Sequence, residues 1–185
     1  MLTWNFNRLL AAARQDNADY FLLIHDDVLP EKHAIDMMLD ILEQHKLGVL
    51  SVALPIRQYP RDASTAIYSA SVHRRLPLKE IQGVVTCPPT DGLRINTGLM
   101  MMDLHTPARD IVFGVGNYID PVTGNVSVYS EDWLMSHQLE EWKVPYGTTT
   151  DIRAWHEADL MLSNEPYGAE VRVDGCESDN RSTEA

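Results

Sequence analysis

The pattern of apolar and polar positions predicts alternating helices and strands over the first third of the chain. Apolar residues recur at helical spacing from Leu2 to about Arg14, with three consecutive alanines, which predicts an amphipathic helix. The short apolar run 20–24 is typical of a strand buried on both faces of a parallel sheet. A second helix and, after Gly48, a second strand over 49–54 follow; the apolar stripe of that helix is Ala34, Met37, Met38, Ile41 and Leu42. This alternation predicts a single α/β domain with a mixed, mainly parallel sheet flanked by helices.

The rest of the chain is more interrupted. Prolines at 60, 77, 88 and 89 favour short strands and loops over 58–91. The run 95–102 is predicted to be a buried strand in which Gly98 marks a close approach of backbone or ligand. Residues 114–130 are predicted to form a long loop of the kind that often acts as a lid, and a helix capped by Ser130 then runs to about Trp142, before a strand at 144–149. We expect one domain over 1–173 and a disordered acidic tail over 174–185.

Composition narrows the classes of function. The chain has 185 residues and 44% hydrophobic content, which suits one core. A net charge of −12 argues against a nucleic-acid partner, whereas a divalent metal held by carboxylates would neutralise a bound diphosphate without a basic surface. Cys87 and Cys176 have no spacing typical of zinc sites or disulfides, and no apolar window resembles a signal peptide or spans a bilayer. We therefore expect a cytoplasmic protein without a transmembrane segment.

The first candidate group for chemistry is a pair of acids at the end of the first strand. Asp26 and Asp27 follow His25 directly, and two adjacent carboxylates repel each other unless a cation or a donor lies between them. A metal site explains the pair. Turn residues and an N-cap for the next helix explain it equally well, since Asp often fills both places.

The second candidate group lies later in the chain. Glu131 and Asp132 open a helix, where the helix dipole alone stabilises acidic residues by about 0.3–1 kcal/mol each. His156 follows a predicted strand, and a lone histidine is more often a hydrogen-bonded residue than a metal ligand. Neither motif indicates a function by itself.

In their order along the chain, these features resemble the GT-A glycosyltransferase family, in particular its family 2-like members. In that family an apolar strand delivers an Asp-x-Asp motif, and His25-Asp26-Asp27-Val28 stands in the equivalent place. A later strand with a small residue lines the acceptor side, similar to Asn96-Thr97-Gly98. A Glu-Asp pair at a helix start supplies the catalytic base, as Glu131-Asp132 would, and a later histidine, similar to His156, completes the metal shell.

The resemblance implies a role for each of these residues. Asp27 and His156 would hold Mn²⁺ or Mg²⁺ on the diphosphate of a nucleotide-sugar donor, and Asp132 would take the proton of an acceptor hydroxyl, with inversion. The residues implied to contact substrate are His25, Asp26, Arg57, Asn96, Thr97, Gly98, Glu131 and Trp133. A surface ion pair for Arg57 and a core position for Trp133 remain alternatives.

The resemblance also implies that the N-terminal part of the fold is shortened. Members of the family place two or more strands before the Asp-x-Asp motif, whereas about twenty residues precede it here. We therefore expect an N-terminally abbreviated form, whose donor pocket an oligomer or a partner chain would complete. Two other functions remain open, namely a non-catalytic binding or assembly module of the same descent and a metal-dependent hydrolase.

Overall fold

A computed structural model describes residues 2–56, 59–69, 72–119, 124, 126–157, 161–163 and 170–171. Arg57, for which the sequence predicts a diphosphate contact, and the predicted tail over 174–185 lie outside the described residues.

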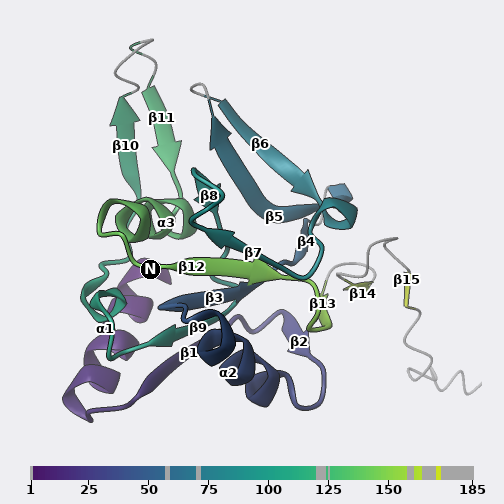
Figure 1. Cartoon of the computed structure of the whole chain (residues 1–185). Coiled ribbons are helices and arrows are strands. Elements are labelled where there is room, and N and C mark those ends of the chain that lie inside the picture. Colours follow the sequence, from purple (N-terminus) through teal and green to yellow (C-terminus); the bar gives the residue numbers. More distant parts are fainter. Residues whose placement is uncertain are drawn as a thin grey trace, which may run out of the picture.

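The centre of the fold is a five-stranded sheet (Figure 1). Its strands, in spatial order, are β1 (Tyr20–Ile24), β9 (Leu99–Asp103), β3 (Val49–Val52), β12 (Tyr146–Thr149) and β7 (Val84–Cys87). β12 pairs with β3 in parallel, whereas β9 is antiparallel to both β1 and β3, and β7 is antiparallel to β12. The fold is thus a mixed α/β domain.

The prediction of a mainly parallel sheet is wrong, because most of the pairings are antiparallel. The alternation of helix and strand did predict that β1 and β3 run in the same direction, since both are antiparallel to β9. β12 runs in this direction too, because it pairs with β3 in parallel. β9 lies between β1 and β3, however, and an apolar run reveals burial without revealing direction. The carboxyl ends of β1, β3 and β12 therefore share one edge of the sheet, where ligands of α/β proteins commonly bind.

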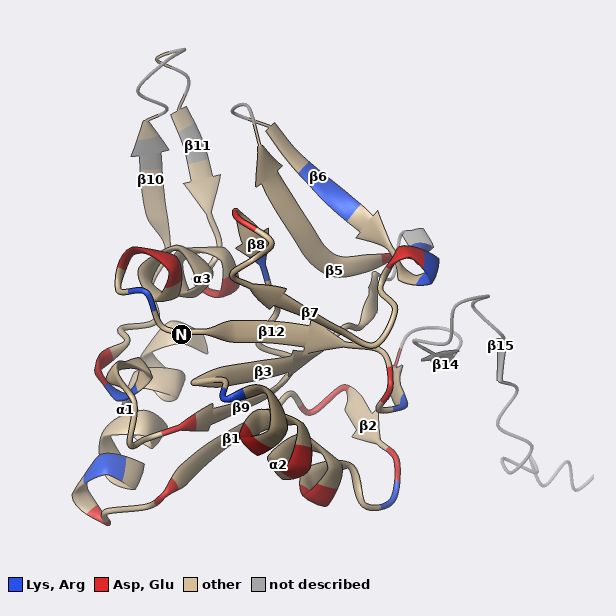
Figure 2. Cartoon of the chain, in the orientation of Figure 1, with Lys and Arg blue, Asp and Glu red and all other residues tan. Residues whose placement is uncertain are grey.

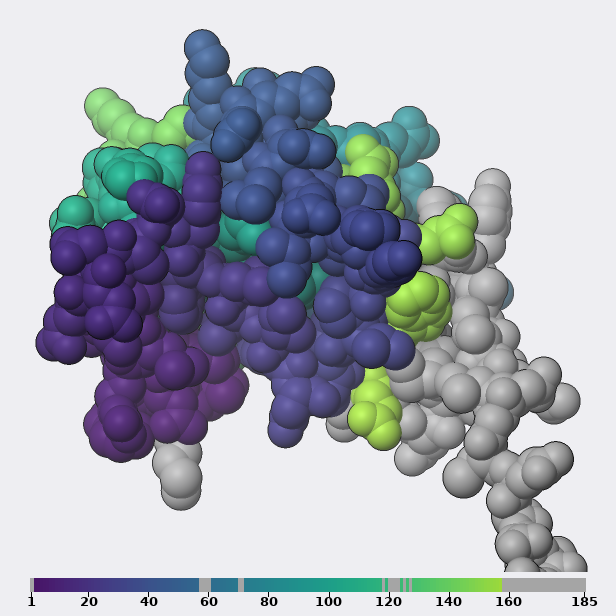
Figure 3. Space-filling view, turned by 90° about the horizontal axis from the view of Figure 1, so that it is seen from below, coloured from purple at the N-terminus to yellow at the C-terminus, as the bar shows by residue number. Residues whose placement is uncertain are grey.

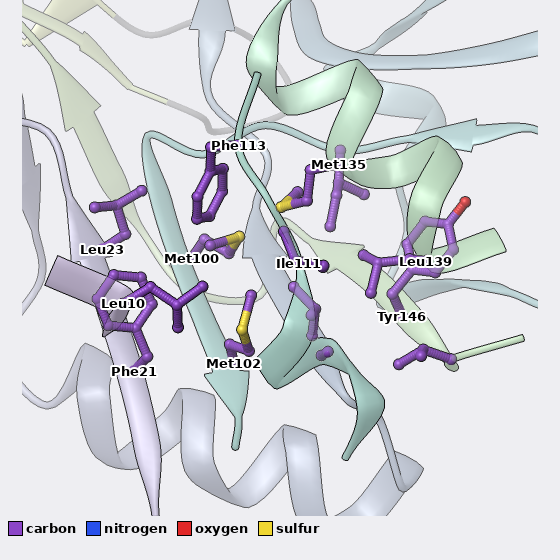
Figure 4. Packing of buried hydrophobic residues seen from close by; sticks show 14 of the residues in the cluster. Leu10, Phe21, Leu23, Met100, Met102, Ile111, Phe113, Met135, Leu139 and Tyr146 are labelled. Atoms are coloured by element: carbon purple, nitrogen blue, oxygen red, sulfur yellow. The ribbon is translucent and has the colours of Figure 1, made fainter. Parts of the chain in front are cut away.

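Helices cover both faces of this sheet. Met100 and Met102 of β9 pack with α1 (Leu2–Gln15) and α3 (Glu131–Glu141), as Figure 4 shows. Leu99 and Met101 lie in a second cluster with α2 (Ala34–His45). Successive side chains of a strand point to opposite faces, which explains why this continuously apolar run is buried on both sides. Each such side chain contributes about 1.5–3 kcal/mol by burial.

In the described part of the chain, three smaller sheets accompany the central one. One has the order β15 (Glu170–Val171), β14 (Met161–Ser163), β13 (Ala154–His156) and β2 (Val28–Pro30). A second contains β4 (Pro55–Ile56), β5 (Tyr59–Ser69), β6 (Val72–Pro77) and β8 (Leu93–Arg94). The third is a hairpin of β10 (Gly116–Ile119) and β11 (Val126–Tyr129), and the 3₁₀ turns η1 (Leu78–Glu80) and η2 (Pro107–Asp110) connect other elements.

Two local predictions need correction. Residues 114–130 do not form a continuous loop, since β10 and β11 lie within them and the alternation of Val126 and Val128 with polar neighbours is typical of a strand. Ser130 stands at the N-cap of α3, but its hydroxyl donates a hydrogen bond to the Asp132 carboxylate instead of capping the backbone. Among the described helices, none combines the length and apolar character needed to cross a membrane.

Candidate functional site

His25, Asp26 and Asp27 form the turn at the carboxyl end of β1. The amide of His25 donates to the Gly98 carbonyl at 2.8 Å, and the Val28 amide donates back to the His25 carbonyl at 3.2 Å. This confirms that the acids are turn residues. They do not cap a helix, because α2 begins at Ala34 after a different N-cap.

The turn brings Asp27 beside His156, although 129 positions separate them in the sequence. The chain leaves the turn as β2, which pairs with β13 so that Val28 lies opposite His156. In Figure 3 the yellow-green residues of this later segment lie next to the dark blue N-terminal part of the chain. A sequence pattern cannot reveal such a pairing of two three-residue strands.

The contacts of His156 show which ring nitrogen carries a proton toward Pro55. Nδ1 lies 3.0 Å from the Pro55 carbonyl, which can only accept a hydrogen bond, so Nδ1 carries a proton. Nε2 lies 3.2 Å from Asp27 Oδ2. In neutral His156 this nitrogen has a lone pair that faces a carboxylate oxygen, an arrangement that is favourable only with a cation between the two atoms. Alternatively, Nε2 is protonated and the two residues form an ion pair.

The distance between these two atoms suits a shared metal ion. Two neighbouring ligands of an octahedral ion, each at about 2.1 Å, lie about 3.0 Å apart. A ligating histidine also usually donates its other ring N–H to a carbonyl or carboxylate, as His156 does to Pro55. One carboxylate and one imidazole could thus both contact a divalent ion; the carboxylate suits Mn²⁺ and Mg²⁺, whereas imidazole suits ions such as Zn²⁺ and Fe²⁺ better.

A different triad of potential ligands lies elsewhere. In the described part of the chain, Cys87, Asp91 and Glu140 form the group of three whose ligand atoms lie within 4.8 Å of one another. The Glu140 carboxylate already accepts hydrogen bonds from Arg94 at 2.9 Å and from the Gly92 amide at 2.7 Å. Burial also raises the pKa of the Cys87 thiol, which disfavours the thiolate that a metal needs. Glu140 belongs to α3, so these contacts are better explained as the attachment of α3 to Gly92 and Arg94.

His25 connects the two acidic motifs. Its ring stacks on Phe6 at 5.6 Å between centroids, and its Nε2 lies 3.4 Å from the Thr97 hydroxyl. Burial lowers the pKa of His25, against the negative charges of Asp27 and Glu131, which raise it. The acidic turn after β1 and the start of α3 thus lie within electrostatic reach of one imidazole, as expected if both belong to one site.

Asn96 and Gly98 have structural partners. The buried Asn96 amide donates to the Val52 carbonyl at 2.8 Å and accepts from the Gly98 amide at 2.9 Å, which ties β3 to β9. A Cβ at Gly98 would lie 2.5 Å from the end of the Leu54 side chain, so the close approach predicted here is one of protein packing. Of the three residues in this segment, only Thr97 directs a side chain toward His25 in the described contacts.

Asp132 lies in the first turn of α3. One carboxylate oxygen accepts hydrogen bonds from the Ser130 hydroxyl and from the Trp133 amide, the latter at 2.8 Å. Burial raises the pKa of Asp132 from 3.8 to about 6, and the charge of Glu131 adds to this effect, against the Ser130 hydrogen bond. The charge of Glu131 is expected from its place next to Asp132 in the sequence, whereas the larger contribution of burial is visible only in the structure.

Trp133 stacks on a residue that sequence reasoning missed. The His73 ring of β6 lies 4.3 Å from the Trp133 ring at an interplanar angle of 23°, and the Arg75 guanidinium lies 5.3 Å from the same ring. Burial, followed by the charges of Arg94 and Arg75, lowers the pKa of His73 to about 4. The imidazole is therefore neutral near neutral pH. In the sequence, His73 is a lone histidine in a segment predicted to form short strands and loops. Nothing in the pattern around it indicated a contact with Trp133.

Comparison with known proteins bears on the fold of this chain alone. No family model matches the chain, and no match was found among curated proteins. Among solved structures, the chain is similar to the one titled "Crystal Structure of A197 from STIV", with 13% sequence identity and a TM-score of 0.56. The similarity covers 95% of this chain and 78% of that chain. At this identity the similarity shows that the two proteins share a mixed α/β fold.

Proposed function

We propose that this chain is a metal-dependent glycosyltransferase that moves a sugar from a nucleotide-diphosphate donor to an acceptor hydroxyl, with inversion at the anomeric carbon. The observation that carries the proposal is the pair of Asp27 Oδ2 and His156 Nε2, 3.2 Å apart, with the second ring nitrogen held by the Pro55 carbonyl. Asp27 follows the carboxyl end of β1, and Pro55 follows that of β3, which runs the same way. In α/β proteins, ligands commonly bind beyond the carboxyl ends of the strands.

Asp27 and His156 would hold the diphosphate end of the donor. A divalent ion bound between them would offset the negative charge that develops on the diphosphate as the bond to the sugar breaks. Two protein ligands are enough for this purpose, because Mg²⁺ and similar ions usually take their remaining ligands from phosphate and water.

Asp132 would act as the general base. Its carboxylate takes the proton of the acceptor hydroxyl while that oxygen bonds to the anomeric carbon, and the nucleoside diphosphate leaves from the opposite face. A base is most effective when its pKa lies near the working pH, and the pKa of about 6 meets this condition. Glu131 supports this state through its charge and is therefore a positioning residue in the proposal.

A product assay tests the proposed function. The full chain is incubated with Mn²⁺ and each of a panel of nucleotide sugars, with and without a mixture of sugar and alcohol acceptors, and free nucleoside diphosphate is measured. We expect release from one donor that requires Mn²⁺ and rises strongly with acceptor. Release that does not respond to acceptor would instead indicate a hydrolase. No release, together with no thermal stabilisation by any nucleoside diphosphate, would indicate a non-catalytic module.

Variants of two acids sharpen this assay. Asp27→Asn should abolish the metal-dependent release, because it removes a proposed ligand. Asp36→Asn is the matched control, since Asp36 lies on α2 with its side chain 77% exposed and outside the proposed site. Equal activity of the two variants would exclude Asp27 from the reaction.

A further inference from the structure

The β10–β11 hairpin has two unlike faces. Ile119 pairs with Val126 across the hairpin, and Asn117 pairs with Val128, so these four side chains share one face. The apolar members of this face are open to solvent, with exposed fractions of 65% for Ile119, 64% for Val126 and 68% for Val128. Tyr129 points to the opposite face and is 1% exposed, close to the His73 ring.

Two more exposed apolar residues lie in the segment before β10. Val112 and Val115 are 59% and 65% exposed, whereas Phe113 between them is buried in the core. We call the set of Ile119, Val126 and Val128, which share one face of the hairpin, the hairpin patch. Single exposed apolar residues are common on protein surfaces, but a contiguous apolar patch usually marks an interaction site.

The hairpin patch is also poor in charge. Charged residues make up 23% of the chain, yet Asp120 is the one charged residue in the segment 112–130. Figure 2 shows this contrast, since the described parts of β10 and β11 carry no charged residue while α2 and α3 display acidic ones. With a net charge of −12, two copies of this protein repel each other over most of their surfaces. The described parts of the hairpin add no charge to that repulsion.

We propose that the hairpin patch is a self-association surface, against which the same patch of a second copy packs about a two-fold axis. A two-fold interface places the same patch of both copies against each other, so an uncharged apolar face is complementary to itself. A two-stranded hairpin is also only marginally stable in water, and a second apolar layer would cover its exposed side. The proposal does not depend on the proposed function.

A second copy fits this patch better than a lipid surface does. Segments that bind membranes usually combine apolar residues with Lys or Arg, and 112–130 contains neither of these. The negative net charge of the chain also opposes approach to anionic lipids.

Sedimentation equilibrium of the full chain over a wide range of concentrations tests the proposal. We expect the molar mass to rise from monomer to dimer in the wild type and to stay at the monomer value in Val128→Glu, because each copy would place a carboxylate in the interface. Val126→Glu provides a second test of the same face. Val72→Glu is the matched control, with a similar exposed fraction of 63% on β6, and should dimerise as the wild type does.

Two results would overturn the proposal. One is a wild type that stays monomeric at every concentration, and the other is dimerisation of both glutamate variants with the strength of the wild type. Co-sedimentation of monomers with vesicles of phosphatidylcholine and phosphatidylglycerol would assign the patch to lipid instead. Because the substituted side chains are largely exposed, far-UV circular dichroism should show the same folded spectrum for all variants.

Discussion

Replacing Asp132 with asparagine is expected to lower the rate of sugar transfer by about 10²- to 10⁴-fold, which is the usual contribution of a general base. The asparagine keeps the shape of the side chain and can still accept the hydrogen bond from the Trp133 amide. It cannot take a proton at neutral pH. Donor binding should therefore persist, and the loss should appear in the turnover rate measured with saturating donor.

The free energy of unfolding distinguishes this loss of transfer rate from a loss of folded protein. The folded state raises the pKa of Asp132 from 3.8 to about 6, so folding favours the protonated form and the native state loses stability as pH rises through this window. A neutral asparagine removes that effect, and Asp132→Asn should be at least as stable as the wild type at neutral pH. Denaturant titrations at acidic and neutral pH measure both free energies of unfolding.

The pH dependence of the wild-type transfer rate should follow the ionisation of Asp132. Transfer needs ionised Asp132, so the rate should rise with pH through about 6 and then level off. Glu141→Gln serves as the control, because Glu141 is an exposed acid at the other end of the same helix. Full transfer by Asp132→Asn would remove Asp132 from the role of base.

Replacing Arg94 with alanine is expected to lower the free energy of unfolding by about 3 kcal/mol. The Arg94 side chain is 2% exposed, and it donates to the Glu140 carboxylate at 2.9 Å and to the Leu93 carbonyl at 3.0 Å. Removing one partner of a buried ion pair typically costs about 3–5 kcal/mol, because the other charge is left without compensation. We expect the lower end of this range, since the Glu140 side chain is 30% exposed and water can reach it.

An exposed pair provides the comparison for Arg94. Arg74 and Glu80 lie 3.1 Å apart with side chains 60% and 46% exposed, so Arg74→Ala should cost less than about 1 kcal/mol. Chemical denaturation of both variants measures the difference. The double variant Arg94→Met with Glu140→Leu should recover most of the lost stability, because it removes both charges. Equal costs for Arg94→Ala and Arg74→Ala would show that the buried pair does not stabilise α3.

The sequence allowed most elements of the core to be predicted. The runs 20–24 and 49–54 contain β1 and β3, and the predicted helices match α1, α2 and α3 closely. The run 95–102 is a strand only in its second half, because β9 begins at Leu99. These elements follow from apolar periodicity, which reports burial directly. The order and direction of strands depend on contacts between distant segments, so the antiparallel position of β9 could not be read from its own apolar run.

For the candidate site, too, the sequence predicted some features and missed others. The sequence identified Asp27 and His156, and the structure places them side by side through the pairing of β2 with β13. It did not identify the Pro55 carbonyl, because a backbone oxygen leaves no signal in a residue pattern. The stack of His73 on Trp133 was missed for a related reason, since β6 and α3 lie far apart in the chain.

Titration of the full chain with Mn²⁺, followed by electron paramagnetic resonance of the free ion, tests the proposed metal site most directly. The titration is made alone and with each of UDP, GDP, CDP, ADP and TDP, on the wild type, Asp27→Asn, His156→Gln and Asp36→Asn. We predict that a nucleoside diphosphate strengthens Mn²⁺ binding by the wild type and by Asp36→Asn. Binding should weaken at least about 10-fold in the Asp27 and His156 variants, because each loses a proposed ligand. Wild-type affinity in both of those variants, or no binding by the wild type with any of these nucleotides, would contradict the proposed site.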